Sequence, residues 1–406
     1  MNRATTADLA QSFDLRELPD DFYTDPFPYY AALRASAPVR PMPDGSWLLT
    51  RYREVEFVYK NPKLFSSDKK REFGAKFGTT PLFAHHTTSL VFNDPPYHTR
   101  VRRMINGALT PRAVQALAPA LTASVNRLIQ SMAAKPGVDL IKDFAAAIPV
   151  EVIGDLLGVP REERAPLRGW SLAILGALEP RLSAAAEQTG NAAVREFSVY
   201  LEDLIERRRR APGGEADLLS CLLRADAEGQ TLSVDELIHN CIFLLNAGHE
   251  TTTNLIGNAL VCLARHPDQR RRLLEEPQLM KSAVEEFLRF ESPNQLGNRI
   301  TTQVVTLGGH ELAAGSQITL CIGAANRDPD QFEQPDRLDL SRTPNLHLAF
   351  ASGIHQCIGM SVARLEAGTA ISALLGRFPA YALSAEPQRG RRARFRGFVS
   401  IPCRLE

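Results

Sequence analysis

The sequence has no marked excess of charge of either sign. Its 47 lysines and arginines nearly balance its 46 aspartates and glutamates, which leaves a formal net charge of +1. A protein that holds nucleic acid through the phosphates needs a basic surface, and this balance provides no such field over the whole molecule. We therefore expect no nucleic acid partner.

Long apolar segments are also missing. Residues 1–23 are interrupted by charges every few positions, so they lack the apolar centre of a signal peptide. Nowhere do about eighteen apolar residues follow one another, which is the length that a membrane-spanning helix requires. We expect a protein with neither a signal peptide nor a membrane anchor.

The cysteines show none of the paired spacings that mark a secreted disulfide framework. They are Cys221, Cys241, Cys262, Cys321, Cys357 and Cys403. This pattern favours a reducing compartment, and a composition of 44% hydrophobic and 23% charged residues is that of an ordinary globular protein. We expect a cytoplasmic protein.

The chain divides into three parts by its local patterns. Residues 36–66 favour a β-rich N-terminal lobe, because strand-like segments at 39–42 and 46–50 flank the turn Pro43-Asp44-Gly45. Periodicity is lost over residues 67–96, where we expect a long functional loop suited to substrate entry. From residue 97 to about 290 helical signals dominate.

One long helix has the clearest signals. Ser233 and Glu236 have the spacing of a capping box, and apolar residues continue to about Arg265. Such a helix would measure roughly 45 Å at 1.5 Å per residue, long enough to be a central strut. Further along, segments 302–307 and 316–322 around Gly308-Gly309 favour a hairpin, and residues 359–378 a helix. The fold class expected is mainly α with minor β-sheets.

The segment from Phe350 to Gly359 places a cysteine just before a helix. The helix dipole and nearby backbone N–H groups favour a thiolate at Cys357. Three interpretations compete: an inert buried cysteine, a nucleophile paired with His355, and a metal ligand. Base rates favour the inert one. A zinc site lacks a second pair of ligands, and a Cys–His hydrolase lacks any local sign of its base.

A resemblance changes this balance. Phe350, Gly353, His355, Cys357 and Gly359 together resemble the haem-ligand signature of the cytochrome P450 family of haem-thiolate monooxygenases. The resemblance implies that residues 350–359 form the haem-ligand loop, with Cys357 as axial thiolate ligand of a heme b iron. It also implies the triangular, mainly helical prism of that family, as a single catalytic domain of residues 1–406.

Glu286 and Arg289 are three residues apart on a predicted helix over residues 280–290. Alone they would form a surface ion pair worth a few tenths of a kcal/mol. Their Glu-x-x-Arg pattern, however, also resembles the family's. That likeness implies a buried structural network of Glu286 and Arg289 with Arg342, which holds the haem loop.

Residues 247–252, Ala-Gly-His-Glu-Thr-Thr, interrupt the long helix with polar groups. By themselves they could mark a simple kink. They also resemble the oxygen-activation site of the family, where an acid–alcohol pair delivers protons. The resemblance implies catalytic roles for Glu250 and Thr251, with Thr252 as a helper.

The haem propionates need cationic partners when they are buried. By likeness to the family, His98 and Arg102 bind them, together with Arg299 and His355. Matching positions also suggest substrate contacts from a mostly apolar set: Phe92, Leu244, Ala247, Asn294, Gln295, Leu296 and Phe398.

The resemblance further implies a reaction and its partners. One oxygen atom of O2 is inserted into a small hydrophobic substrate, and a separate ferredoxin with its NAD(P)H-dependent reductase supplies the electrons to a monomeric enzyme. An acidic carrier would suit a positive face formed by Arg100, Arg103, Arg112 and Arg364. The alternatives are peroxide-driven oxidation, desaturation, coupling or rearrangement, and a haem sensor or carrier without catalysis.

Overall fold

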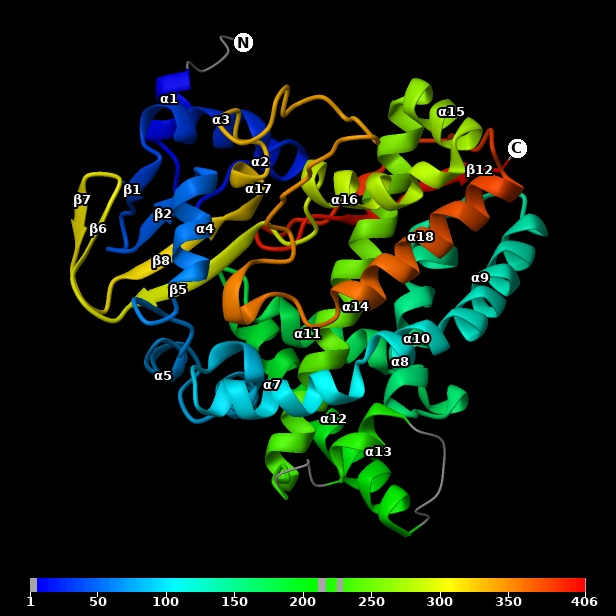
Figure 1. The fold of residues 1–406 in the computed structure, drawn as a ribbon, viewed down its shortest axis with the longest axis horizontal. Helices are drawn as coiled ribbons and strands as arrows, with labels where there is room; N and C mark the ends of the chain where they lie inside the picture. Colours follow the sequence, from blue (N-terminus) through cyan, green and yellow to red (C-terminus); the bar gives the residue numbers. More distant parts are fainter. Residues whose placement is uncertain (1–5, 211–216, 225–228, 406) are drawn as a thin grey trace.

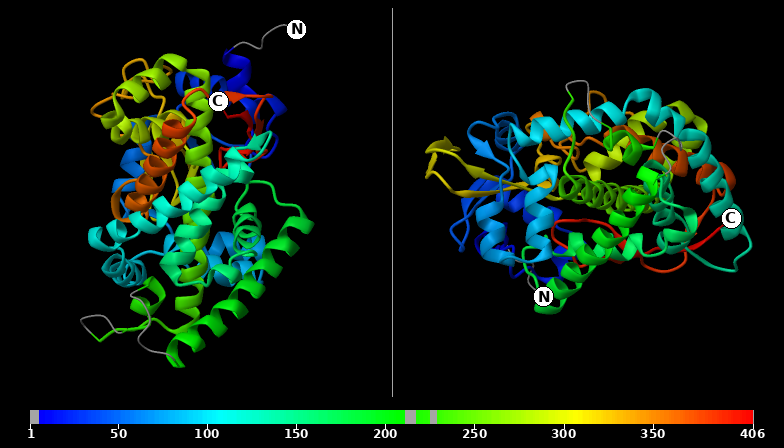
Figure 2. Two further views of the ribbon diagram at one scale, coloured as in Figure 1. Left: turned by 90° about the vertical axis from the view of Figure 1, so that its right-hand side faces the viewer. Right: turned by 90° about the horizontal axis from the view of Figure 1, so that it is seen from below.

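Helix α14 (Val234–Arg265) runs through the middle of the molecule (Figure 1). The computed structural model describes residues 6–210, 217–224 and 229–405. The Ser233 hydroxyl accepts a hydrogen bond from the Glu236 N–H at 3.2 Å, and the Glu236 carboxylate accepts one from the Ser233 N–H at 2.9 Å. The predicted capping box therefore starts the predicted central helix. Seen from below, α14 again crosses the middle of the molecule (Figure 2).

Most of the other long helices pack against α14 or against its neighbours. They are α9 (Ala118–Ala133), α10 (Ala147–Leu157), α11 (Leu167–Gly176), α12 (Ala184–Arg210), α16 (Met280–Phe290) and α18 (Met360–Arg377). The shorter helices are α1 (Thr6–Gln11), α2 (Asp20–Thr24), α3 (Phe27–Ser36), α4 (Tyr52–Lys60), α5 (Lys70–Phe77), α6 (Pro81–Thr88), α7 (Tyr97–Ala108), α8 (Pro111–Ala116), α13 (Leu218–Leu222), α15 (Pro267–Glu275) and α17 (Ile322–Ala325).

Short 3-10 turns cover Leu90–Phe92, Arg161–Glu163, Pro277–Leu279 and Gly353–His355, and a π-helical turn covers Ile141–Ala145. Among the helices of the described chain, none combines the length and the apolar character needed to cross a bilayer.

A five-stranded sheet stands at one side of the helical body (Figure 1). Its strand order is β1 (Val39–Pro41), β2 (Trp47–Leu49), β8 (Gln317–Cys321), β5 (Leu296–Thr301), β3 (Phe65–Ser66). The smaller sheets contain β6 (Val305–Leu307) with β7 (His310–Leu312), β10 (Gln388–Arg389) with β11 (Phe398–Ser400), and β4 (Val138–Asp139), β12 (Pro402–Arg404) and β9 (Ala382–Leu383). The fold is therefore mainly helical with small sheets, as expected.

The hairpin expected between residues 302–307 and 316–322 is wrong. Strand β6 turns at Gly308-Gly309 and pairs with β7, so Val305 lies opposite Leu312. Strand β8 instead pairs antiparallel with β5, with Leu296 opposite Cys321. The turn at Gly308-Gly309 was predicted correctly. Because both glycines have positive φ and close a two-residue connection, β6 must pair with the strand that follows directly, β7, and not with β8.

The long loop expected over residues 67–96 is also wrong, because two helices form there. Phe73 and Phe77, four residues apart, share the buried face of α5. The residues that break the periodicity mark helix ends: Gly78, at φ +61°, terminates α5, and Pro81 occupies the first turn of α6.

Two hydrophobic cores lie along α14. Its N-terminal half, from Leu237 to Leu245, belongs to one core with α11, α12 and α13. Its C-terminal half, from Leu255 to Leu263, belongs to another with α9, α16 and α18. The mostly polar segment 246–254 therefore falls between the two cores, and a cavity opens beside it.

Candidate active site

A cavity of about 320 Å³ lies beside the middle of α14. Its walls come from segments far apart in the chain: α6, α10, the residues after α11, α14, β5, the 349–359 loop, the start of α18 and residues 394–395. Leucine and phenylalanine side chains make up much of the lining, and polar groups gather at a few points. Such a mixture suits a mostly apolar ligand that a few polar groups orient.

Cys357 faces this cavity just before α18. Its N–H donates to the Phe350 carbonyl at 2.9 Å, which closes the loop. Gly353 has φ +69°, and a Cβ there would lie 2.3 Å from the Tyr59 carbonyl oxygen, so only glycine fits. Gly359 directly precedes α18, and the Arg364 guanidinium lies over the Phe350 ring at 4.8 Å.

The Cys357 thiol is in a mixed environment. Burial raises its pKa, whereas the Gly359 N–H and the charges of Arg102 and Arg364 oppose that rise. A backbone N–H and two guanidinium groups near one sulfur are what a thiolate ligand needs.

Three of the four residues predicted to bind the propionates, Arg102, Arg299 and His355, line the cavity, and His98 packs beside His355 without lining it. Arg102 donates to the Gln356 carbonyl at 2.6 Å, and Arg299 donates to the Asn298 carbonyl at 2.7 Å and lies over the Tyr59 ring. Neither arginine forms an ion pair with another described residue. The rings of His98 and His355 are 4.0 Å apart.

These groups fit the carboxylates of a buried haem. Both nitrogens of His98 and Nε2 of His355 are buried without a hydrogen-bond partner in the described part of the chain. Burial and the charges of Arg299, His98 and Arg102 lower the pKa of His355 to about 2. Buried cations and orphaned donors at one end of an apolar cavity are incomplete without an anionic partner.

Helix α14 contributes Ala247, Gly248, Thr251 and Thr252 to the wall. The Thr251 hydroxyl donates to the Ala247 carbonyl one turn earlier, at 2.8 Å. A Cβ at Gly248 would lie 2.6 Å from the Ile153 side chain, so a small residue lets α10 approach here. The alcohol groups predicted for the site therefore border the same cavity as Cys357.

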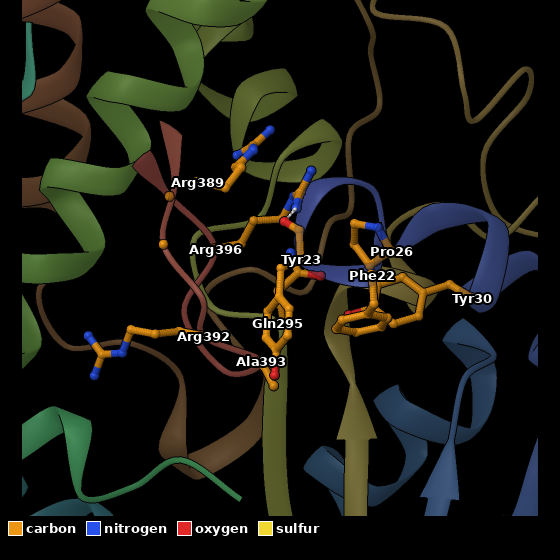
Figure 3. A pocket seen from close by; sticks show the side chains of 11 residues that line it. Phe22, Tyr23, Pro26, Tyr30, Gln295, Arg389, Arg392, Ala393 and Arg396 are labelled. Carbon is orange, nitrogen blue, oxygen red and sulfur yellow. Dashed lines mark hydrogen bonds between the residues drawn. The ribbon is translucent and has the colours of Figure 1, made fainter. Parts of the chain in front are cut away.

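Glu250 is directed elsewhere. It is buried but does not line the cavity, and its carboxylate forms an ion pair with Arg392, leaving Oε2 without a partner. Arg392 points away from Gln295 (Figure 3) and also lies 3.4 Å from Glu179, after α11. Burial raises the pKa of Glu250 more than Arg392 lowers it.

Five of the seven suggested substrate contacts line the cavity: Phe92, Leu244, Ala247, Asn294 and Leu296. Gln295 does not. In the extended segment it lies between two lining residues, so its side chain points to the opposite face. There it donates to the Ser292 carbonyl at 2.6 Å and lies near Tyr23 and Ala393 (Figure 3).

Phe398 also lies outside the cavity wall. It packs into the core against α14 under the guanidinium of Arg389, 3.8 Å from its ring centroid. Phe395 lines the cavity in its place. Sequence reasoning also missed Arg394, Asn246, His85 and His86 on the wall; the only signal was the density of arginines over residues 389–396.

Glu286, Arg289 and Arg342 form one network. Arg289 binds both oxygens of Glu286 at 2.8 Å, and Arg342 Nε lies 3.2 Å from the same carboxylate. Arg289 also donates to the Asn326 and Pro335 carbonyls. The network thus ties α16 to the irregular segment that leads to the cysteine loop.

Comparisons with known proteins identify the family of this chain. The family model described as "Cytochrome P450" matches residues 178–402. The vitamin D(3) 25-hydroxylase of Pseudonocardia autotrophica is 42% identical over 367 residues, 89% of each chain. The 6-deoxyerythronolide B hydroxylase of Saccharopolyspora erythraea is 37% identical over 401 residues, 95% of this chain and 98% of that one.

The solved structures show the same fold. P450BioI, in complex with an acyl carrier protein ligated to hexadec-9Z-enoic acid, superposes with a TM-score of 0.90 and 35% identity, covering 95% of this chain and 100% of that one. CYP109E1 of Bacillus megaterium, in complex with testosterone, superposes with a TM-score of 0.83 and 34% identity, covering 94% of this chain and 99% of that one. With these matches over nearly its whole length, the chain belongs to the cytochrome P450 family of monooxygenases, which implies haem with a cysteine thiolate ligand.

Proposed function

We propose that this chain inserts one oxygen atom of O2 into an apolar organic substrate, as a single catalytic domain of residues 1–406 that works as a monomer. The observation that carries the proposal is the position of the Cys357 sulfur, which borders the same cavity as the hydroxyl-bearing residues Thr251 and Thr252. A thiolate ligand and a proton-delivering alcohol on one apolar cavity are the two groups that this chemistry needs.

The residues present fit heme b. The Cys357 thiolate would bind its iron, and Arg102, Arg299, His98 and His355 would hold the propionates through charge-assisted hydrogen bonds. When bound, the haem supplies the iron at which dioxygen is reduced. The apolar lining excludes bulk water from that centre.

Thr251 and Glu250 would manage the protons. The Thr251 hydroxyl, held by the Ala247 carbonyl, presents a donor at the cavity wall. Burial raises the pKa of Glu250, which favours its protonated form, and Glu250 lies next to Thr251 in the chain. Arg392 positions that carboxyl, and Thr252 assists on the same wall.

The substrate would be mostly apolar, in contact with Phe92, Leu244, Ala247, Asn294 and Leu296. The relatives named as hydroxylases of vitamin D(3) and 6-deoxyerythronolide B support an oxidation of this kind. We propose hydroxylation as the reaction, in the cytoplasm.

Electrons would come from a separate ferredoxin and its NAD(P)H-dependent reductase. The expected positive face carries less free charge than its four arginines suggest, because Arg100 pairs with Glu236 and Arg364 with Glu285. The partner is therefore proposed from the family alone.

The spectrum of the reduced protein with carbon monoxide tests the proposal. A cysteine thiolate ligand gives a strongly red-shifted Soret band. We expect Cys357→His to abolish that band and Cys262→Ser, which changes another buried cysteine, to keep it. Purified protein without porphyrin, after expression with ample iron and porphyrin precursor, would contradict the proposal.

Turnover separates the enzyme from its alternatives. Steady NADPH consumption with product, when ferredoxin, reductase and substrate are supplied, supports a monooxygenase. Product formed with peroxide alone would support a peroxide-driven enzyme, and ligand binding without product would support a haem sensor.

A further inference from the structure

Two cations near the cavity have no carboxylate partner. Arg394, on the cavity wall, donates to the Leu178 carbonyl at 3.3 Å, to the Leu296 carbonyl at 2.8 Å and to the side-chain oxygen of Asn298. Lys76 of α5 donates to the carbonyls of Ala177 at 2.8 Å and Glu179 at 3.1 Å. All of these acceptors are neutral, and neither cation forms an ion pair with any residue that the structure describes.

The two cations are neighbours. Together they bind three consecutive carbonyls, those of residues 177–179, so their charged ends converge on one short segment after α11. The side chain of Leu178 in that segment lines the cavity. Burial, followed by the charge of Arg394, lowers the pKa of Lys76 to about 8, and the more weakly acting charges of Glu72, Glu179 and Glu187 do not offset the shift.

His86 of α6 lies within the field of both cations. It lines the cavity, its Nε2 has no hydrogen-bond partner in the described chain, and its ring packs among Phe73, Phe77 and Phe92. Burial and the charges of Lys76 and Arg394 lower its pKa to about 3. A neutral imidazole can donate one N–H to an acceptor.

The nearest carboxylates are already engaged. Glu72 pairs with Lys69, and Glu179 binds Arg392 and the N–H groups of Ala393 and Arg394. Neither carboxylate forms an ion pair with Arg394 or Lys76, so both cations lack a direct anionic partner among the described residues. Burying charge without a partner is costly, so the site is complementary to an anion that a ligand would bring.

We propose that Arg394, with Lys76 and His86 beside it, binds the carboxylate of the substrate, so that the enzyme acts on hydrophobic carboxylic acids. The inference rests on the proposed function and names its substrate class. Leu175, Leu178, Phe243 and Phe395 line the same cavity and would cover the apolar chain of such an acid. A bidentate guanidinium is well suited to a carboxylate.

Binding of dodecanoate and methyl dodecanoate to the holoenzyme, measured by equilibrium dialysis, tests the proposal. Both probes carry the same chain, but only the first is charged. We expect wild-type protein to bind dodecanoate about 30-fold more tightly, as one charge-assisted hydrogen-bond site allows. Arg394→Gln should remove this preference and leave ester binding unchanged. Arg391→Gln, an exposed arginine of the same loop paired with Asp20, should keep it.

Equal loss of acid and ester binding in Arg394→Gln would show that Arg394 only holds the segment after α11 in place through its hydrogen bonds. That result would overturn the proposal. So would a wild-type protein that does not prefer the acid. If Arg394→Gln does not fold, two other measurements decide whether the proposal holds. They are the ratio of acid to ester affinity in the wild-type protein and the same ratio in Lys76→Met, which we expect to be several-fold lower. Dialysis does not depend on the iron, so acid selectivity without a thiolate Soret band would refute the proposed function alone.

Discussion

Thr251 and Thr253 make the same local hydrogen bond in different surroundings. The Thr251 hydroxyl donates to the Ala247 carbonyl at 2.8 Å, and the Thr253 hydroxyl to the His249 carbonyl at 3.0 Å. Thr251 borders the cavity, whereas Thr253 is buried away from it. Replacing either threonine should therefore affect the helix itself in the same way. Only the replacement of Thr251 should affect proton delivery.

We expect Thr251→Ala to uncouple electron use from product formation. Loss of the donor should lower product per NADPH by roughly tenfold or more and raise hydrogen peroxide correspondingly. The measurement is the ratio of product to NADPH consumed, with Thr253→Ala as the matched control. Unchanged coupling in Thr251→Ala would remove this residue from the proton route.

Arg392 should tune the acid in that route. Its charge opposes the rise in the pKa of Glu250 that burial causes, so Arg392→Gln should raise this pKa further. If protonated Glu250 donates, the alkaline limb of the kcat profile moves to higher pH. The exposed Arg391→Gln should leave the profile in place. A profile that does not move in Arg392→Gln would mean that Glu250 does not titrate in the rate-limiting step.

For single residues, the sequence indicated which residues belong to the site better than it indicated the directions of their side chains. Cys357, Thr251 and the arginines proposed to bind the propionates were named from their resemblance to family motifs, and the structure places them on one cavity. Gln295 could not be separated from Asn294 and Leu296 by its chemistry, because only the strand alternation decides which of them faces inward. Arg394 was missed because its partners lie in segments far away in the sequence.

Among the elements, α14 and α16 were predicted well, because caps and apolar periodicity are local signals. The helices over residues 70–88 were missed for the converse reason. Helix α6 is stabilised by packing against α12 and α14, and α5 by packing against α6, and short, glycine-interrupted sequences do not reveal such contacts. The pairing of β8 with β5 is likewise a long-range contact that no turn signal specifies.

The joint between α16 and the irregular segment after α17 should be the costliest to break. Arg289 and Glu286 are fully buried, so replacing Arg289 with methionine leaves a carboxylate without its main partner. We expect a loss of about 3–5 kcal/mol in the free energy of unfolding, measured from urea denaturation.

Arg272→Gln provides the comparison for that variant. Arg272 pairs with Glu276 four residues further along, on the surface, and donates to the Ser341 hydroxyl at 3.1 Å, so its loss should cost about 0–1 kcal/mol. Similar urea midpoints for the two variants would show that the α16 network contributes no more than a surface pair.

For the whole molecule, the buried carboxylates set the response to acid. Glu285 on α16 accepts hydrogen bonds from Arg364 on α18 and from His347 near the cysteine loop. Glu291, after α16, binds Arg389 and Arg396 of the C-terminal segment. In each case burial raises the pKa, but the partners outweigh it and lower the pKa to about 2.

A folded-state pKa of about 2 against an ordinary value of 4.5 means that each carboxylate stabilises the fold above pH 4.5, by roughly 3 kcal/mol. That contribution is lost as the pH falls from 4.5 through 2. We expect the free energy of unfolding to drop steeply across this window, and Glu285→Gln to flatten the drop. Glu386→Gln, which changes an exposed carboxylate, should leave the slope unchanged. An equally steep acid transition in Glu285→Gln would mean that other groups hold these elements together.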